Sequence, residues 1–296
     1  MRSCPAKSLC SRVIVRSGAQ RDGEEIARFL ETLYARFNRR DMVHPDPLEF
    51  LYGYSDPRDR ELVGLVAAAL AYGRVAQILK SVGDILARLG PRPRQTVMEV
   101  ESSDLENLLR GFRHRFTTGK ELAGLLKGAA RLMREHGSLG DSLSRHLRPG
   151  DCTILPALCA WISELDSASL GIASKVLASP SRGSSCKRLH LYLRWMVRRD
   201  QVDPGGWDGI SPSLLVVPLD VHMHRVGLTL GFTQRKQADL LTAMEITDGF
   251  RSICFDDPVK YDFVLTRPGI WGQGESFWEE RRSSNGIPKL QRPDRW

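Results

Sequence analysis

The most informative segment of this 296-residue chain is Val217-Pro-Leu-Asp-Val-His-Met-His-Arg-Val-Gly-Leu-Thr-Leu-Gly231. Pro218 comes just before a predicted helix, and Asp220 stands at its start. Aspartate is a favoured N-cap residue, because its carboxylate accepts hydrogen bonds from N–H groups that the first helical turn leaves without partners. We therefore predict a helix over residues 219–230. Capping alone would be enough to explain Asp220.

Helical spacing of apolar residues also dominates the rest of the chain. Residues 62–72 form an almost wholly apolar run rich in alanine, which predicts a buried central helix. Only two short runs, 13–15 and 214–217, look like strands. The predicted fold class is therefore all-α. The other predicted helices cover residues 24–40, 75–89, 105–112, 120–135, 154–165, 170–177, 187–199, 236–250 and 258–265.

Charge and hydropathy limit the classes of function. The net charge of +8 is typical of proteins that bind a polyanion, most often nucleic acid. The sequence has no run of about 18 apolar residues, so we predict no membrane span. Residues 1–22 lack the apolar core of a secretory signal and are predicted to be a disordered leader. Residues 276–296 have no periodicity and are predicted to be a flexible tail, which leaves one helical domain over 23–275.

A second segment, Ser179-Pro-Ser-Arg-Gly-Ser-Ser-Cys-Lys-Arg188, joins two of the predicted helices. Pro180 and Gly183 favour a tight turn, and the start of the following helix presents N–H groups that suit a phosphate. Lys187 falls in the first turn of that helix, where the helix dipole disfavours a cation. This placement would lower the pKa of the lysine, as an amine nucleophile requires. A solvated lysine that binds a phosphate is the simpler alternative.

The segment Pro-Leu-Asp220-Val-His222-x-x-Arg225 resembles the Pro-Val-Asp-Thr-His-x-x-Arg signature of the helix-hairpin-helix DNA glycosylase superfamily, which includes endonuclease III and the 8-oxoguanine glycosylases. Bifunctional members carry a lysine at the start of the helix after the hairpin, and Lys187 matches that position. The long interval between Lys187 and Asp220 looks more like the archaeal 8-oxoguanine glycosylase branch. The whole pattern also looks like a conserved bacterial family of unassigned function.

Other segments extend the resemblance over roughly residues 25–270. Residues 61–71 are similar to the buried helix before the family's damage-recognition loop, and residues 111–116 with 122–137 are similar to a family helix pair. The hairpin departs from the usual Leu-Pro-Gly-Val-Gly, because residues 179–183 read Ser-Pro-Ser-Arg-Gly. The chain also lacks four closely spaced cysteines near its C-terminus, so the resemblance brings no iron–sulfur cluster.

The resemblance implies a two-lobed helical fold with a helix-hairpin-helix element and a cleft that holds Lys187 and Asp220. The lobes would not be sequential, because the N-terminal helix packs with the C-terminal helices in this superfamily. The implied activity is that of a base-excision repair DNA glycosylase and AP lyase, in which Lys187 forms a Schiff base and Asp220 assists. The implied partner is double-stranded DNA with an oxidised base such as 8-oxoguanine. We expect a monomer in the cytoplasm, associated with the bacterial nucleoid.

The candidate site residues follow from position along this pattern. No cofactor is expected, although the hairpin could hold a monovalent cation, and no metal is expected because His222 and His224 point apart on a helix. His222 and Arg225 are expected to support Asp220. The base pocket is assigned to Trp195, Trp207, Tyr261, Asp262, Phe263 and Trp271, with a helix cap as the alternative role of Asp262. Contacts to DNA are assigned to Arg74, Gln77, Arg182, Gly183, Ser184, Arg188, Arg194 and Arg198.

Three other functions remain open from the sequence. A monofunctional glycosylase would use Asp220 and a water molecule, with Asp200 and Asp203 as second-choice carboxylates. A non-catalytic helical module would bind DNA or RNA on the same scaffold. An enzyme that acts on RNA is the third.

Overall fold

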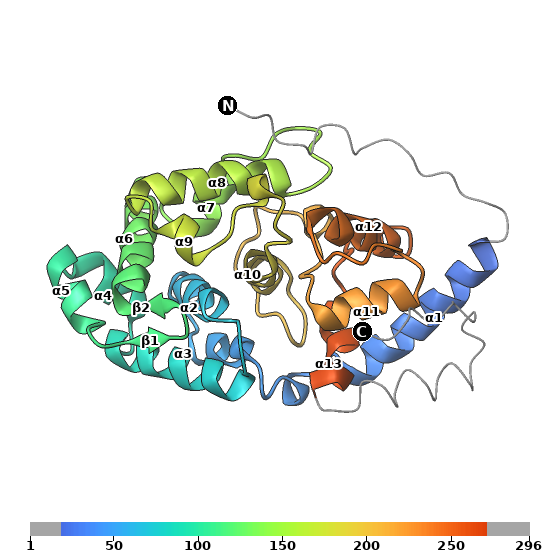
Figure 1. The fold of residues 1–296 in the computed structure, drawn as a ribbon, viewed down its shortest axis with the longest axis horizontal. Coiled ribbons are helices and arrows are strands. Elements are labelled where there is room, and N and C mark those ends of the chain that lie inside the picture. Colours follow the sequence, from blue (N-terminus) through green and yellow to red (C-terminus); the bar gives the residue numbers. More distant parts are fainter. Residues whose placement is uncertain (1–18, 271–296) are drawn as a thin grey trace.

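The computed structural model describes residues 19–270, and this part of the chain is predominantly helical (Figure 1). The all-α prediction is confirmed. In the described range, the strands are one antiparallel pair, β1 (Arg113–His114) and β2 (Thr117–Thr118). The α-helices are α1 (Ala19–Phe37), α2 (Pro57–Ala69), α3 (Val75–Leu89), α4 (Pro93–Glu99), α5 (Ser102–Leu108), α6 (Gly119–His136), α7 (Leu139–Ser144), α8 (Leu155–Ala168), α9 (Ala173–Val176), α10 (Lys187–Val197), α11 (Val221–Thr229), α12 (Leu240–Arg251) and α13 (Asp262–Ile270).

Several element boundaries differ from the predictions. Helix α2 begins five residues before the predicted start, because Asp56 accepts a hydrogen bond from the Arg58 N–H and Pro57 occupies the first helical position. Helix α1 begins at Ala19, so it includes the last four residues of the predicted leader. Residues 1–18 of that leader and the predicted tail, 276–296, lie outside the described range. Residues 214–217 form no strand, and 13–15 are also outside that range. Short 3₁₀ turns, at Arg40–Met42, Pro47–Gly53, Pro180–Arg182 and Pro212–Leu214, complete the regular structure.

The helices fall into two groups with α10 between them (Figure 1). In one group, α6 packs against α4, α5, α7, α8 and α9, while α2 packs against α3 and α4. In the other group, α11 packs against α12 and α13, and α1 packs against α13. The first and last described helices are therefore neighbours in space. Helix α10 packs closely on α2 in the first group, and its Arg194 pairs with Asp262 of α13 in the second, so α10 joins the two groups.

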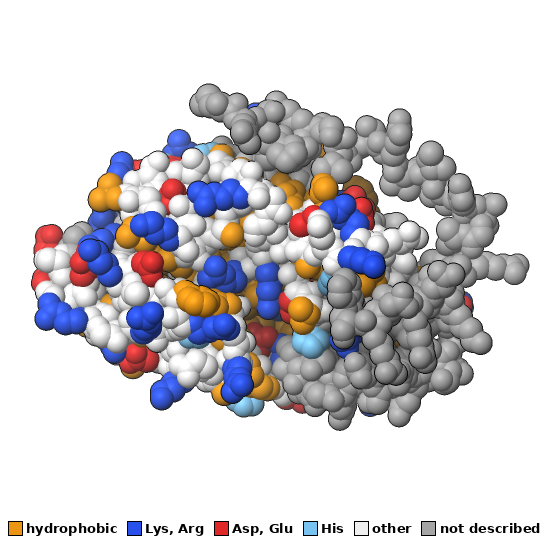
Figure 2. Space-filling model, viewed as in Figure 1, with side chains coloured by type: hydrophobic (Ala, Val, Ile, Leu, Met, Phe, Trp, Pro, Cys, Tyr) orange, Lys and Arg blue, Asp and Glu red, His pale blue; other side chains and the backbone are white. Residues whose placement is uncertain are grey.

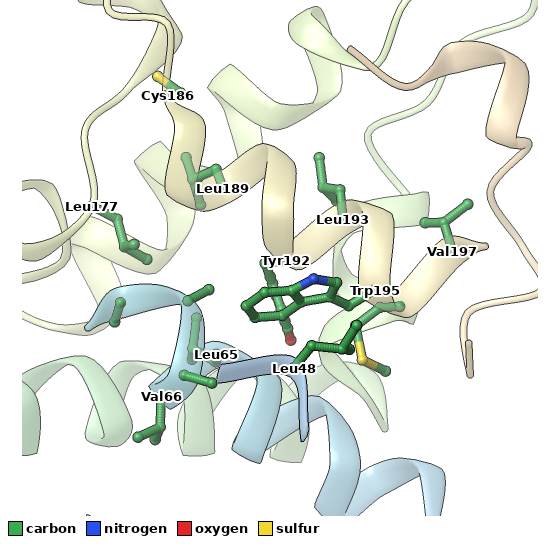
Figure 3. Packing of buried hydrophobic residues seen from close by; sticks show 14 of the residues in the cluster. Leu48, Leu65, Val66, Leu177, Cys186, Leu189, Tyr192, Leu193, Trp195 and Val197 are labelled. Carbon is green, nitrogen blue, oxygen red and sulfur yellow. The ribbon is translucent and has the colours of Figure 1, made fainter. Parts of the chain in front are cut away.

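The centre of the molecule is the contact between α2 and α10. Every α2 residue from Glu61 to Ala69 is buried, as the apolar run predicts. Figure 3 shows Tyr192 and Trp195 reaching from α10 toward Leu65 and Leu48. The absence of a side chain at Gly64 permits this approach, since a Cβ there would lie 3.0 Å from the Tyr192 ring. Among the described helices, none is both long and apolar enough to cross a membrane.

Candidate active site

Lys187 is the first residue of α10, directly after a compact turn. Pro180–Arg182 form a 3₁₀ turn, and Gly183 follows with a φ of 76°, a left-handed conformation that suits glycine. Cys186 is also left-handed, with a φ of 46°, and its N–H donates to the Ser184 hydroxyl over 3.2 Å. The tight turn therefore lies where the sequence predicts it, and it places the lysine at the start of the helix.

Asp220 is the N-cap of α11, as predicted. Its Oδ1 accepts hydrogen bonds from the N–H groups of His222 and Met223, both over 2.9 Å. Its other oxygen, Oδ2, lies 3.4 Å from the Nζ of Lys187. The two oxygens therefore have different roles, because one holds the helix start and the other faces the lysine amine. Capping and pairing with Lys187 are compatible in this geometry.

A cavity of about 210 Å³ adjoins the Lys187–Asp220 pair. Its walls come from both helix groups and from α10, so it lies where the two groups meet. His222, which was expected to support Asp220, is part of the wall. The lining residues are Pro45, Asp46, Pro47, Ala71, Gly73, Val75, Ile78, Lys187, Leu191, Arg194, Trp195, Pro218, Asp220, His222, Asp262, Thr266 and Arg267.

A buried ion-pair network adjoins this cavity and contributes to its wall. Arg194 pairs with Asp262, and its Nε lies 3.2 Å from Asp203 Oδ1. Arg198 pairs with Asp203 and contacts Asp257 over 2.8 Å. Both guanidinium groups are buried and already hold carboxylates, so neither is exposed to contact the DNA backbone, although Arg194 lines the cavity. Helical spacing alone could not reveal partners that follow much later in the chain.

Burial changes the protonation of the carboxyl group of Asp262. Its side chain is only 3% exposed, and this burial raises its pKa to about 6, although Arg194 acts in the opposite direction. The negative charge of Asp220 also contributes to the increase in pKa. Asp262 therefore titrates at about pH 6, and it lines the same cavity as Lys187.

The predicted aromatic pocket forms only in part. Trp195 lines the cavity, whereas Trp207, Tyr261 and Phe263 are buried and do not line it. Trp207 donates to Glu61 over 3.0 Å, Tyr261 donates to Glu31 over 2.6 Å, and Phe263 packs under the Arg267 guanidinium, 4.3 Å from the ring centre. Trp271 lies outside the described residues.

Most of the other residues assigned to DNA contact are accessible. The side chains of Arg74, Gln77 and Arg182 are exposed, as is Gly183, whereas Ser184 is half-buried. Arg225, which was expected to support Asp220, is also exposed. Arg188 is also half-buried, because it donates to the Ala69 carbonyl over 2.6 Å and stacks over the Tyr72 ring at 4.9 Å. Figure 2 shows Lys and Arg side chains around an apolar patch near the middle of the face in view, over the region of β1, β2 and α10.

The β1–β2 hairpin and the residue at its tip have no counterpart among the predicted elements and site residues. Residues 111–116 are similar to part of a family helix pair, but residues 113–118 form a hairpin with a two-residue turn, in which Arg115 adopts a φ of 51°. Phe116 at this tip is 79% exposed, and the Arg115 guanidinium lies 5.5 Å from its ring centre. The Tyr72 hydroxyl donates to the His114 carbonyl over 2.7 Å, which ties the hairpin to the loop beside Gly73 at the cavity.

The described residues include one group of side chains that could ligate a metal, Glu135, His136 and Glu164. These residues belong to α6 and α8 and do not line the Lys187 cavity. Glu164 already bridges two imidazoles, since its oxygens lie 2.8 Å from His136 Nε2 and 2.7 Å from His146 Nε2. These contacts explain the cluster as a hydrogen-bonded bridge between α6, α8 and His146.

Comparisons with known proteins give one match. The model of a family described as a protein of unknown function (DUF2400) matches residues 46–271, a range that contains every residue of the cavity except Pro45. No curated protein and no solved structure matches the chain.

Proposed function

We propose that this chain, which belongs to that family of unknown function, is a DNA glycosylase with AP-lyase activity that removes an oxidised base. Lys187 would be the nucleophile and Asp220 its carboxylate partner. The observation that carries the proposal is the 3.4 Å approach of Lys187 Nζ to Asp220 Oδ2 beside a cavity of about 210 Å³. An amine within reach of a carboxylate that can accept its proton is an arrangement that suits covalent catalysis by lysine.

The chemical steps can be assigned to these two side chains. The neutral Lys187 amine attacks C1′ of the nucleotide, the C1′–N bond breaks, and the base leaves with the bonding electrons and takes up a proton. The nitrogen then passes a proton to O4′ as the C1′–O4′ bond breaks, which opens the sugar ring and leaves a protonated Schiff base at C1′. Loss of a C2′ proton then breaks the C3′–O bond, with the phosphate as leaving group. The Asp220 carboxylate is close enough to accept a proton and to stabilise positive charge at the sugar.

The surroundings of the pair support DNA as the substrate. A damaged base must leave the duplex stack before it can reach a cavity. The exposed Phe116 ring and the exposed Arg74 lie on loops tied to the cavity wall, where an aromatic ring could fill the space left in the duplex. The exposed Arg182 and Gly183 precede α10 and suit a phosphate. The two helix groups, with terminal helices α1 and α13 packed together, support the two-lobed architecture of the helix-hairpin-helix glycosylases.

Borohydride trapping on duplex DNA tests this proposal directly. The reagent reduces a Schiff base to a stable amine, so the full chain should become covalently linked to duplexes with an abasic site or 8-oxoguanine. Lys187→Ala should abolish this cross-link. Lys260→Ala is a matched control, because Lys260 also pairs with a carboxylate, Glu31 at 2.6 Å, but does not line the cavity. The control should trap like the wild-type chain.

Other outcomes would replace the proposal with one of its rivals. Base release without trapping, kept in Lys187→Ala and lost in Asp220→Asn, would indicate a monofunctional glycosylase. Duplex binding without base release or trapping across a broad lesion panel would indicate a non-catalytic module. Tighter binding to structured RNA than to lesion duplexes would favour an RNA enzyme.

A further inference from the structure

An arginine–carboxylate pair on the cavity wall is only half satisfied. Arg194 Nη1 donates to Asp262 Oδ2, but Arg194 Nη2 and Asp262 Oδ1 are buried and have no partner among residues 19–270. Both side chains are 3% exposed, and both residues line the cavity beside Lys187. The pair thus has one buried donor and one buried acceptor without hydrogen-bond partners in the described part of the chain.

Two further donors on the same wall have no partner in the described part of the chain. These are Trp195 Nε1 and Arg267 Nε, which belong to residues that are almost fully buried and line the cavity. Buried polar groups are normally hydrogen-bonded, because an unmade bond in a low-dielectric interior is costly. Because four unsatisfied polar atoms belong to residues of one cavity wall, they suit a polar ligand that would complete them.

The size of the cavity restricts this ligand. At about 210 Å³ it is smaller than the roughly 300–1,000 Å³ of pockets that hold drug-sized molecules. One heterocyclic base is a ligand of suitable scale. Apolar wall residues such as Leu191 and Ile78 suit the faces of such a ring.

We propose that Arg194 and Asp262 select bases that present a carbonyl beside a ring N–H, that is, a lactam edge. This inference rests on the proposed glycosylase function. The ring N–H would donate to Asp262 Oδ1, and the carbonyl would accept from Arg194 Nη2. A carbonyl oxygen has two lone pairs and can accept from a second donor such as Trp195 Nε1, whereas a ring nitrogen can accept only once. Three open donors and one open acceptor thus favour oxo bases over adenine-type bases, which carry an amino group and no carbonyl.

The protonation of Asp262 fits this role. Its pKa of about 6 keeps the carboxyl ionised at neutral pH, so both its oxygens accept hydrogen bonds there. The charged groups that face it are Arg194, Asp203 and Asp220. Since Arg194 remains charged throughout, protonation of Asp262 below about pH 6 would replace the open acceptor with an O–H donor and weaken lactam recognition.

A lesion panel with the wild-type chain tests the selectivity without any variant. Single-turnover excision is measured on matched duplexes that contain hypoxanthine, 8-oxoguanine or 5-hydroxyuracil, which have a lactam edge, and 3-methyladenine or 1,N⁶-ethenoadenine, which have no carbonyl. We expect the best lactam base to be excised at least about 100-fold faster than either carbonyl-free base, because a site built to hydrogen-bond a substrate rejects analogues that leave its polar groups unpaired. Equal or faster excision of a carbonyl-free base would overturn the inference.

Asp262→Asn tests the residue itself. The amide keeps the size of the side chain but removes the charged acceptor. We expect the ratio of lactam-base excision to trapping at an abasic site, which has no base to read, to fall at least about tenfold. An unchanged ratio would show that Asp262 is only structural. Asp257→Asn is a matched control, because Asp257 belongs to the same arginine network but does not line the cavity, and it should keep the ratio.

Thermal unfolding of both variants shows whether each is folded at the assay temperature. If Asp262→Asn is unfolded there, the wild-type lesion panel decides alone. The failure of the proposed function gives a different result, because the wild-type chain would then neither release any base nor trap at an abasic site.

Discussion

The two ends of α10 carry charges in opposite settings. At its N-terminus, Lys187 is 35% exposed and lies 3.4 Å from Asp220, which is 21% exposed. In its second half, Arg194 and the following Arg198 are at most 4% exposed and between them contact four carboxylates. The N-terminal end therefore carries one accessible ion pair, whereas the other end carries several buried ion pairs.

This difference separates the buried charges that stabilise the fold from the accessible charges that can contact a ligand. A buried charge must be paired, so each arginine of the network fixes α10 against the segments that supply its carboxylates. An exposed ion pair contributes little to stability and can exchange its partner for a ligand. The buried network therefore positions α10, and the pair at the other end is the one that a ligand can reach.

Asp203→Ala should have the largest effect on stability. Asp203 is fully buried and pairs with both Arg194 and Arg198, so its removal leaves two buried guanidinium groups with fewer partners. We expect the free energy of unfolding in urea to fall by about 3–5 kcal/mol. Asp208→Ala is the control, because the Asp208–Arg199 pair is exposed, and it should have no measurable effect. Equal effects of the two changes would remove the contrast between buried and exposed charges.

Glu61 shows what burial does to a carboxyl group that is held by N–H donors. Burial raises its pKa to about 7, although the N–H groups of Leu139, Trp207 and Gly140 act in the opposite direction. Because the folded-state pKa exceeds the ordinary value of 4.5, the folded chain holds more protons than the unfolded chain between these values. The contribution of Glu61 to stability should therefore decrease as pH rises from about 4.5 to 7.

Urea unfolding of wild type and Glu61→Gln across this pH range measures the contribution. The free energy of unfolding of the wild-type chain should fall, relative to that of the variant, by up to about 1.4 kcal/mol per pH unit. Parallel pH profiles would show that Glu61 does not carry the proton. Asp141→Asn, at the exposed start of α7, is the control that should leave the wild-type slope unchanged.

Local sequence rules predict the start of α11, the turn before α10 and the buried course of α2. Each depends on a few consecutive residues, such as the Asp220 cap, Gly183 in a left-handed turn, or an unbroken apolar run. These features place Lys187 and Asp220 at helix starts. They do not bring the two side chains together, because that approach depends on how α10 and α11 pack.

The rest of the site depends on contacts that no local pattern encodes. Arg194 and Arg198 look like solvated charges on a helix, and their partners Asp262 and Asp257 follow 68 and 59 residues later. The β1–β2 hairpin lacks glycine or asparagine at its turn, and Arg115 adopts the left-handed conformation instead. Phe116 is an exposed aromatic residue, which apolar patterning assigns to the core.

Lys187→Ala should have the smallest effect on stability. Its ion pair with Asp220 is partly exposed, so solvent screens it, and its loss should change the free energy of unfolding by less than about 1 kcal/mol. Asp220→Ala should cost about 1 kcal/mol, because it also removes the cap of α11, whereas Asp220→Asn keeps a capping side chain. Urea unfolding of the three variants would show this order. A Lys187→Ala loss as large as that of Asp203→Ala would place the lysine in the structural network and leave the accessible end of α10 without a separate role.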